Sequence, residues 1–143
     1  SHALPLGTPC PDFRLPSGSD HGAPVWLRFR PARHLGTCGR VDLNAVFGQQ
    51  VRCRAFACTY VESASVGMFP FLVEHDDGIS IWVNGKDAYC NSLSMPAITS
   101  RIRIELPLVQ GRNRVVVRID QVREHWQFRL SPEGDGGVCG APF

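Results

Sequence analysis

Two adjacent aspartates, Asp76 and Asp77, are the residues whose type and spacing point most directly to chemistry. Ca²⁺ takes sets of about 6–8 oxygen ligands, so two carboxylates need help from backbone carbonyls, water or another loop. The candidate helpers are Asp87, Asn91 and Asp120. The mechanical alternative is that Asp77 and Gly78 form a turn while Asp76 caps backbone amides. We prefer the turn and keep calcium binding as the second hypothesis.

Trp82 and Trp26 are candidate ligand-binding side chains, because each lies in the polar register of a strand-like segment. In segment 79–83, isoleucine and valine alternate with the other residues, so a period of two sends Trp82 to the side opposite the core. Segment 25–30 places Trp26 in the same way. An exposed indole offers a flat apolar face to a sugar ring or an anchor to a protein interface. The alternative is that each indole packs under a loop; Trp126, in core register, we assign to packing.

Arginine is the commonest residue on the solvated sides of the later strand-like segments. In segment 101–108, Arg103 alternates with isoleucine and leucine, so it faces away from the core. We predict Arg103 as a third ligand-binding residue. An ordinary charged surface is the alternative. The other arginines in this register are Arg101, Arg114, Arg118 and Arg129.

No catalytic constellation is visible, so we expect no enzyme and assign no catalytic residue. Glutamate and histidine are scattered, and spacing in the sequence brings none of them together as an acid–base or nucleophile pair. The residues considered are Glu62, Glu74, Glu105, Glu124, His75 and His125. No closely spaced cysteine or histidine pair predicts zinc, and no cofactor other than calcium is indicated.

The elements that must position these residues are short strands. Asp77-Gly78 and Asn84-Gly85 are dipeptides typical of two-residue hairpin turns, so the chain around segment 79–83 is predicted to be an antiparallel meander. Segment 41–47 predicts one short helical turn that begins near Asp42 and ends at Gly48. Further strands are predicted over 25–30, 51–61, 68–74, 101–108, 113–120 and 125–130. Many short strands with almost no helix predict an all-β, antiparallel β-sandwich.

Length and composition limit the domain organisation and the partners. The chain has 143 residues, 43% hydrophobic and 20% charged, which suits one domain with a substantial core. We expect an extended N-terminal arm over 1–22 and a single β-sandwich domain over 23–143. A net charge of +2 without a basic tract argues against nucleic acid. No apolar run approaches the roughly 20 residues needed to span a bilayer, so no membrane span is expected.

From about residue 41 to 130 the chain resembles the galactose-binding-like β-sandwich (jelly-roll) accessory domains of secreted glycoside hydrolases. The matching pieces are VDLNAVFG at 41–48, TYVES at 59–63, DDGISIWVNGKDA at 76–88, LPLVQGRNRVVVRID at 106–120 and HWQFRL at 125–130. The chain is also similar to protective-antigen-type lectin domains, in which a paired-aspartate turn can hold calcium beside a sugar. Six cysteines depart from the usual pattern. The resemblance implies the fold more firmly than the ligand.

The functional expectation is a non-catalytic carbohydrate-binding or accessory module of a secreted protein. The alternative is a protein–protein interaction or structural domain that uses an arginine- and tryptophan-bearing sheet face. Secretion is favoured by the even number of cysteines, which suits disulfides in an oxidising compartment. The competing interpretation is that some cysteines are buried thiols: Cys53 and Cys58, five residues apart, would face opposite sides of one strand.

We therefore predict that the intact mass, compared with and without reduction before alkylation, shows at least four of the six cysteines protected. The six are Cys10, Cys38, Cys53, Cys58, Cys90 and Cys139. Alkylation of all six without reductant would remove the argument for secretion.

Overall fold

A computed structural model describes residues 35–36, 40–91, 101–122, 124–134 and 138–140. The predicted arm over 1–22, the predicted strand over 25–30 and Trp26 lie outside the described residues. Expectations about them stay predictions.

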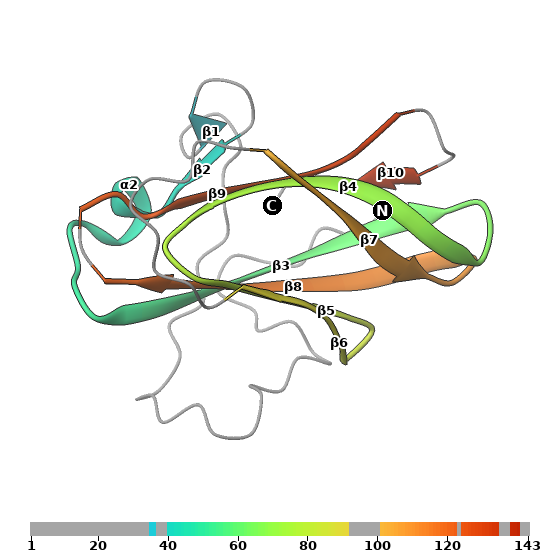
Figure 1. Cartoon of the computed structure of the whole chain (residues 1–143), viewed down its shortest axis with the longest axis horizontal. Coiled ribbons are helices and arrows are strands. Elements are labelled where there is room, and N and C mark those ends of the chain that lie inside the picture. The colour runs from blue at the N-terminus through green and yellow to red at the C-terminus, as the bar shows by residue number, and fades with distance from the viewer. Residues whose placement is uncertain (1–34, 37–39, 92–100, 123, 135–137, 141–143) are drawn as a thin grey trace, which may run out of the picture.

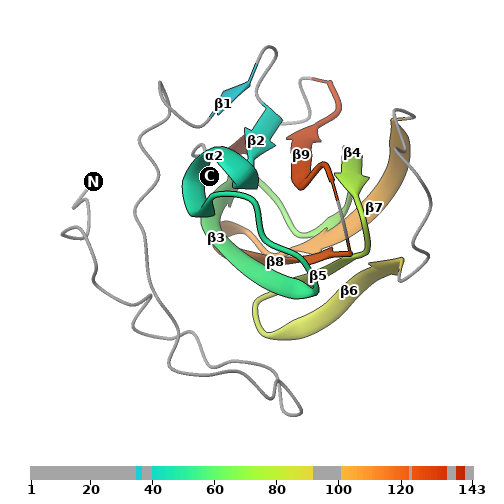
Figure 2. The same ribbon diagram turned by 90° about the vertical axis from the view of Figure 1, so that its left-hand side faces the viewer.

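Two antiparallel sheets face each other and form a sandwich (Figures 1 and 2). The first sheet has the order β1-β2-β9-β4-β7, with β1 at Leu35–Gly36, β2 at Arg40–Asp42, β4 at Gly67–Asp76, β7 at Ile102–Leu108 and β9 at Gln127–Pro132. The second sheet has the order β10-β3-β8-β5-β6, with β3 at Cys53–Ser63, β5 at Ile79–Val83, β6 at Lys86–Asn91, β8 at Gly111–Gln121 and β10 at Val138–Gly140.

The described residues confirm the predicted fold class. Every strand pair is antiparallel. The helix α2, Leu43–Phe47, is five residues long. It has the predicted limits, because the Asp42 side chain accepts hydrogen bonds from the Asn44 and Ala45 amides and Gly48 ends it with a positive φ. No helix in the described part of the chain is long and apolar enough to cross a membrane.

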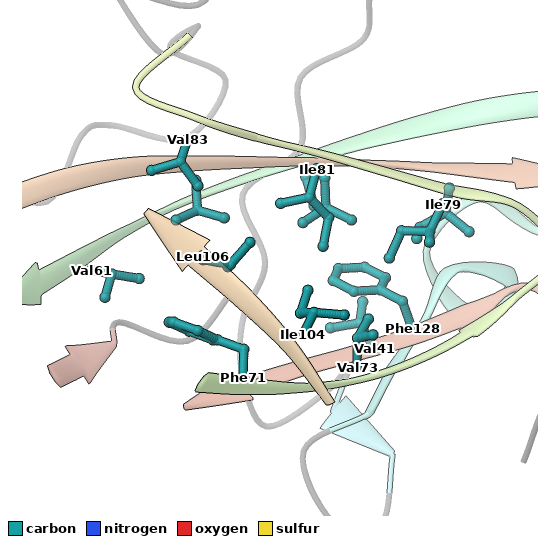
Figure 3. Packing of buried hydrophobic residues seen from close by; sticks show 14 of the residues in the cluster. Val41, Val61, Phe71, Val73, Ile79, Ile81, Val83, Ile104, Leu106 and Phe128 are labelled. Atoms are coloured by element: carbon teal, nitrogen blue, oxygen red, sulfur yellow. The ribbon is translucent and has the colours of Figure 1, made fainter. Parts of the chain in front are cut away.

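The hydrophobic core lies between the sheets, where the alternate side chains of both inner faces meet (Figure 3). Phe71 and Val73 from β4 and Phe128 from β9 face Ile79 and Ile81 from β5 across this core. The predicted core faces of β7 and β8 are confirmed. Their buried members are Ile104, Leu106, Leu108, Val115, Val117 and Ile119, while Ile102 on β7 and Leu130 on β9 are partly buried against the core. Trp126 is buried, as predicted.

The two predicted turns have different outcomes. Asn84 and Gly85 join β5 to β6 with positive φ at both residues, which confirms the hairpin. Asp77 and Gly78 do not form one, because β4 belongs to the first sheet and β5 to the second. The meander prediction is wrong at this link. Dipeptide chemistry predicts a change of direction, but strand pairing, which local sequence does not specify, decides whether the chain folds back or crosses over.

The packing of Gly78 explains why glycine suits the crossover. A Cβ at this position would lie 3.0 Å from Asp120 Oδ2, tighter than most Cβ contacts in proteins, so the Asp120 side chain would have to shift slightly. The link also bonds to β8, because the Asp120 amide donates to Gly78 O at 2.8 Å. Gly78 therefore leaves room for the Asp120 side chain beside the link, whereas the expected role was a hairpin turn.

A carboxylate held by two arginines lies on the outer face of the first sheet. Glu74 on β4 is buried, and its two oxygens accept from Arg40 at 3.0 Å and Arg101 at 2.9 Å. Burial by itself would raise the pKa of Glu74, but the hydrogen bonds and charges of Arg101 and Arg40 outweigh burial and lower it. This ion cluster ties β2 to β4 and to the residue that precedes β7.

Glu74→Gln should lower the free energy of unfolding at pH 7 by roughly 1–3 kcal/mol, the range for hydrogen bonds to charged groups. Because the folded-state pKa is lowered, the carboxylate stabilises the fold above the ordinary glutamate pKa of about 4.3, and this contribution is lost as pH falls through the folded-state pKa. Urea denaturation across this pH range should show the unfolding free energies of wild type and Glu74→Gln converging in acid. Glu62→Gln, at an exposed position on the second sheet, is the control. A difference in unfolding free energy between wild type and Glu74→Gln that stays the same in acid would contradict the electrostatic explanation.

Candidate functional site

The outer face of the second sheet presents Trp82, where its register predicted it. Ile79, Ile81 and Val83 are buried in the core, while Trp82 is half-buried on the opposite side of β5. The pairing of β5 with β6 shifts register between Ile81 and Trp82. The role of Trp82 in binding stays a prediction.

Aromatic and arginine side chains surround Trp82 on this face. Phe56 from β3 lies with its ring centroid 6.5 Å from that of Trp82. The Arg118 guanidinium lies 5.9 Å from the Trp82 ring centroid, and Arg112 stacks on Tyr60 at 3.8 Å. The sequence carried a signal for this arrangement, since period-two alternation in 53–63 and 111–121 places these side chains outward. We call Phe56, Tyr60, Trp82, Arg112 and Arg118 the aromatic–arginine face.

Arg103, the third predicted ligand-binding residue, does not join this face. It lies on β7, on the outer side of the first sheet, and pairs with Glu105 and Glu133, each at 2.7 Å. These carboxylates raise the pKa of Arg103, the hydrogen bond with Glu133 contributing most. A ligand at Arg103 would compete with two intramolecular carboxylates. Trp82 and Arg103 therefore belong to different surfaces.

Asp77 stabilises the backbone at the end of the sandwich that carries α2. Its Oδ2 accepts from the Val122 amide at 2.6 Å, which ties the β4–β5 link to the segment after β8. Its own amide donates to Asp120 O at 3.2 Å, and its carbonyl contacts His75 Nδ1. The predicted capping role thus belongs to Asp77, although it was assigned to Asp76. It acts on a distant segment of the chain.

Asp76 is buried beside Asp77 in an unfavourable electrostatic environment. Burial raises the pKa of Asp76, and the adjacent Asp77 carboxylate raises it further, while His125 opposes the shift and Glu124 adds to it. Spacing in the sequence brought Glu124 and His125 together with no other titratable residue. The fold brings both beside the paired aspartates, and no local pattern could have shown that.

Unpartnered acceptors collect at the same end of the sandwich. Within the described part of the chain, Asn44 Oδ1, His75 Nε2 and Gln121 Oε1 are buried without a hydrogen-bond partner. Asn44 and Gln121 both donate to Glu124 O through their amide nitrogens, at 2.9 and 3.3 Å. Burial lowers the pKa of His75 and so favours the neutral ring, although the hydrogen bond and charge of Asp77 oppose the shift. Its inward register, shared with Phe71 and Val73 on β4, was readable from the sequence.

The fit of these residues to calcium is partial. Carboxylate and amide oxygens are the ligand type that Ca²⁺ prefers. One oxygen of Asp77 is already bonded to Val122, and Asp120, a candidate helper, pairs with Arg54 and Arg118 at 3.1 Å. Asp87 on β6 lies opposite Trp82 in the strand register, which is at the other end of β5 from Asp77. No group of three or more His, Cys, Asp or Glu side chains placed to hold a metal occurs among the described residues. Calcium binding by Asp76 and Asp77 stays a prediction.

The described cysteines give the disulfide expectation no support. No disulfide joins Cys53, Cys58 and Cys90 to one another in the described structure. Burial raises the pKa of the Cys53 thiol, as expected for a packed thiol. Cys10, Cys38 and the Cys139 side chain lie outside what the structure describes.

Comparison with known proteins returned no matching family model, no matching curated protein and no matching solved structure.

Asp77→Ala should lower the free energy of unfolding by roughly 1–3 kcal/mol, because it leaves the Val122 amide without its acceptor. Asp76→Ala should preserve or raise stability at neutral pH, because it removes a buried carboxyl group whose raised pKa makes ionisation costly as pH increases. Thermal melts of both variants, with Ca²⁺ and with EDTA, test this difference. A Ca²⁺-dependent rise in Tm that Asp76→Ala abolishes would show instead that the paired aspartates bind metal.

Proposed function

We propose that this chain is a non-catalytic binding module of a secreted protein that recognises carbohydrate through the aromatic–arginine face. The observation that carries the proposal is the position of Trp82, which leaves the core while its neighbours on β5 are buried. An indole on a sheet face can stack on the C–H face of a sugar ring, and the N–H groups of Arg118 that are not paired with Asp120 can donate hydrogen bonds to hydroxyl groups.

The sandwich architecture is compatible with the resemblance to galactose-binding-like jelly-roll accessory domains. Consecutive strands repeatedly change sheets, as in the steps from β3 to β4, β4 to β5, β7 to β8 and β8 to β9. The jelly-roll assignment, secretion and disulfide formation are parts of this proposal. They rest on the sequence motifs and the cysteine count.

A protein partner is the second candidate, and a specific observation favours it. Tryptophan and arginine are the side chains most enriched at the energetic centres of protein interfaces, and they are adjacent here, with Arg118 5.9 Å from the Trp82 ring centroid. The same face would then bury Trp82 against protein.

A glycan array screened with wild type and Trp82→Ala, with and without Ca²⁺, tests the proposal. Wild type should bind a defined set of glycans, and Trp82→Ala should weaken that binding by roughly 1–3 kcal/mol, the range for truncation of an interface anchor. Met68→Ala, which shortens an exposed apolar side chain on the first sheet, is the matched control and should bind like wild type.

Three results separate the candidates. Absence of glycan binding by folded wild type would contradict the carbohydrate proposal. Equal losses of glycan binding in Trp82→Ala and Met68→Ala would show that the aromatic–arginine face is not the carbohydrate site. Glycan binding that requires Ca²⁺ and survives Trp82→Ala would move the site to Asp76 and Asp77.

A further inference from the structure

Asp120 on β8 lies between two arginines on the outer face of the second sheet. Its Oδ1 forms ion pairs with Arg54 Nε and with Arg118 Nε, each at 3.1 Å, and its Oδ2 accepts a hydrogen bond from Arg118 Nη2 at 3.3 Å. Arg54 is its partner in the strand register, and Arg118 is two residues earlier on β8, so all three side chains leave the same face of the sheet. One carboxylate therefore contacts two cations, and it contacts Arg118 through both of its oxygens.

The ion pair with Arg118 is the more shielded of the two. The side chains of Arg118 and Asp120 are 23% and 24% exposed, whereas that of Arg54 is 42% exposed. Exposed ion pairs are weak, because solvent screens the charges and ordering long side chains costs entropy. We therefore expect Asp120 to fix the direction of Arg118 more firmly than that of Arg54.

The backbone of Asp120 is itself held by the β4–β5 link. Its amide donates to Gly78 O at 2.8 Å, and its carbonyl accepts from the Asp77 amide at 3.2 Å. A Cβ on Gly78 would lie 3.0 Å from Asp120 Oδ2, the oxygen that accepts from Arg118 Nη2. The carboxylate thus has a fixed place from which to orient an arginine, and a side chain at residue 78 would disturb it.

The arginine that Asp120 orients lies beside Trp82. The Arg118 guanidinium carbon is 5.9 Å from the Trp82 ring centroid, within the range of about 6 Å for a cation–π contact. The pairing with Asp120 engages Nε and Nη2, so Nη1 is the nitrogen that it leaves for a ligand. A donor already held in one direction loses less conformational freedom on binding than a mobile one.

We propose that Asp120 is a positioning residue of the aromatic–arginine face, which orients Arg118 so that a ligand stacked on Trp82 meets the Nη1 hydrogens. Asp120 acts through Arg118 and does not itself contact the ligand. This inference rests on the proposed function, because it assigns a role within that binding face. The competing interpretation is that Asp120 only ties β3 to β8, in which case its loss would lower stability and leave recognition unchanged.

A double-mutant cycle on affinity for the glycan with the strongest signal on the array tests this role. Asp120→Asn keeps the shape and removes the charge, so it should weaken binding roughly tenfold, and Arg118→Met should weaken it at least as much. Adding Asp120→Asn to Arg118→Met should cost no further affinity. Arg54→Met removes the other partner of Asp120 and is the matched control, with wild-type affinity expected. Gly78→Ala should weaken binding in the same direction as Asp120→Asn, although it alters no charge.

Tryptophan emission supplies a readout that needs no ligand. The contribution of Trp82 is the difference between spectra recorded with and without Trp82→Phe. It should change in Asp120→Asn and in Arg118→Met, because both alter the cation beside the indole. It should not change in Arg54→Met.

Thermal melts verify that each variant is folded, and Gly78→Ala carries the test if Asp120→Asn does not fold. Additive losses in the double variant overturn the positioning role, as does wild-type affinity in folded Asp120→Asn or an equal loss in Arg54→Met. Absence of glycan binding by folded wild type contradicts the proposed function instead. The Trp82 emission then decides the role of Asp120, and emission that Asp120→Asn leaves unchanged overturns it.

Discussion

The structure depends on one constraint, the burial of alternate side chains from two sheets against each other. Ile79, Ile81 and Val83 enter the core from β5, so Trp82 must face outward. The same rule on β4 buries His75 in line with Phe71 and Val73. A shift of one residue in any strand would exchange its two faces, so the core fixes the outward residues as firmly as the inward ones.

Each end of the sandwich is held by one polar side chain that bonds to distant backbone. At the α2 end, Asp77 bonds the amide of Val122. At the other end, Asn113 bonds both backbone groups of Val109, and its Oδ1 accepts from Asn84 at 2.8 Å, so the β5–β6 and β7–β8 turns share one anchor. The ends differ in what surrounds these anchors: buried acceptors and carboxylates lie near Asp77, and exposed aliphatic side chains lie near Asn113. This asymmetry permits separate roles for the two ends.

Sequence patterns predicted what depends on local chemistry. Period-two alternation identified the β-sandwich and the direction of Trp82, and capping chemistry placed α2 between Asp42 and Gly48. Pairing across the chain was not predictable in this way. The Asp77-Gly78 dipeptide looked like a hairpin but crosses between sheets, and the approach of Glu124 and His125 to Asp76 requires β8, β9 and β4 to be in place. The same limit applies to Glu74, whose arginine partners come from distant segments.

The register of the tryptophans gives the most direct test of this account, because the core assignment and the proposed binding face both depend on it. Chemical denaturation of Trp82→Ala and Trp126→Ala compares an outward indole with one that is 2% exposed. Trp126→Ala should lose roughly 3–5 kcal/mol of unfolding free energy, as truncation of a buried aromatic does, and Trp82→Ala should lose much less. A loss in Trp82→Ala as large as that in Trp126→Ala would place Trp82 in the core and contradict the account.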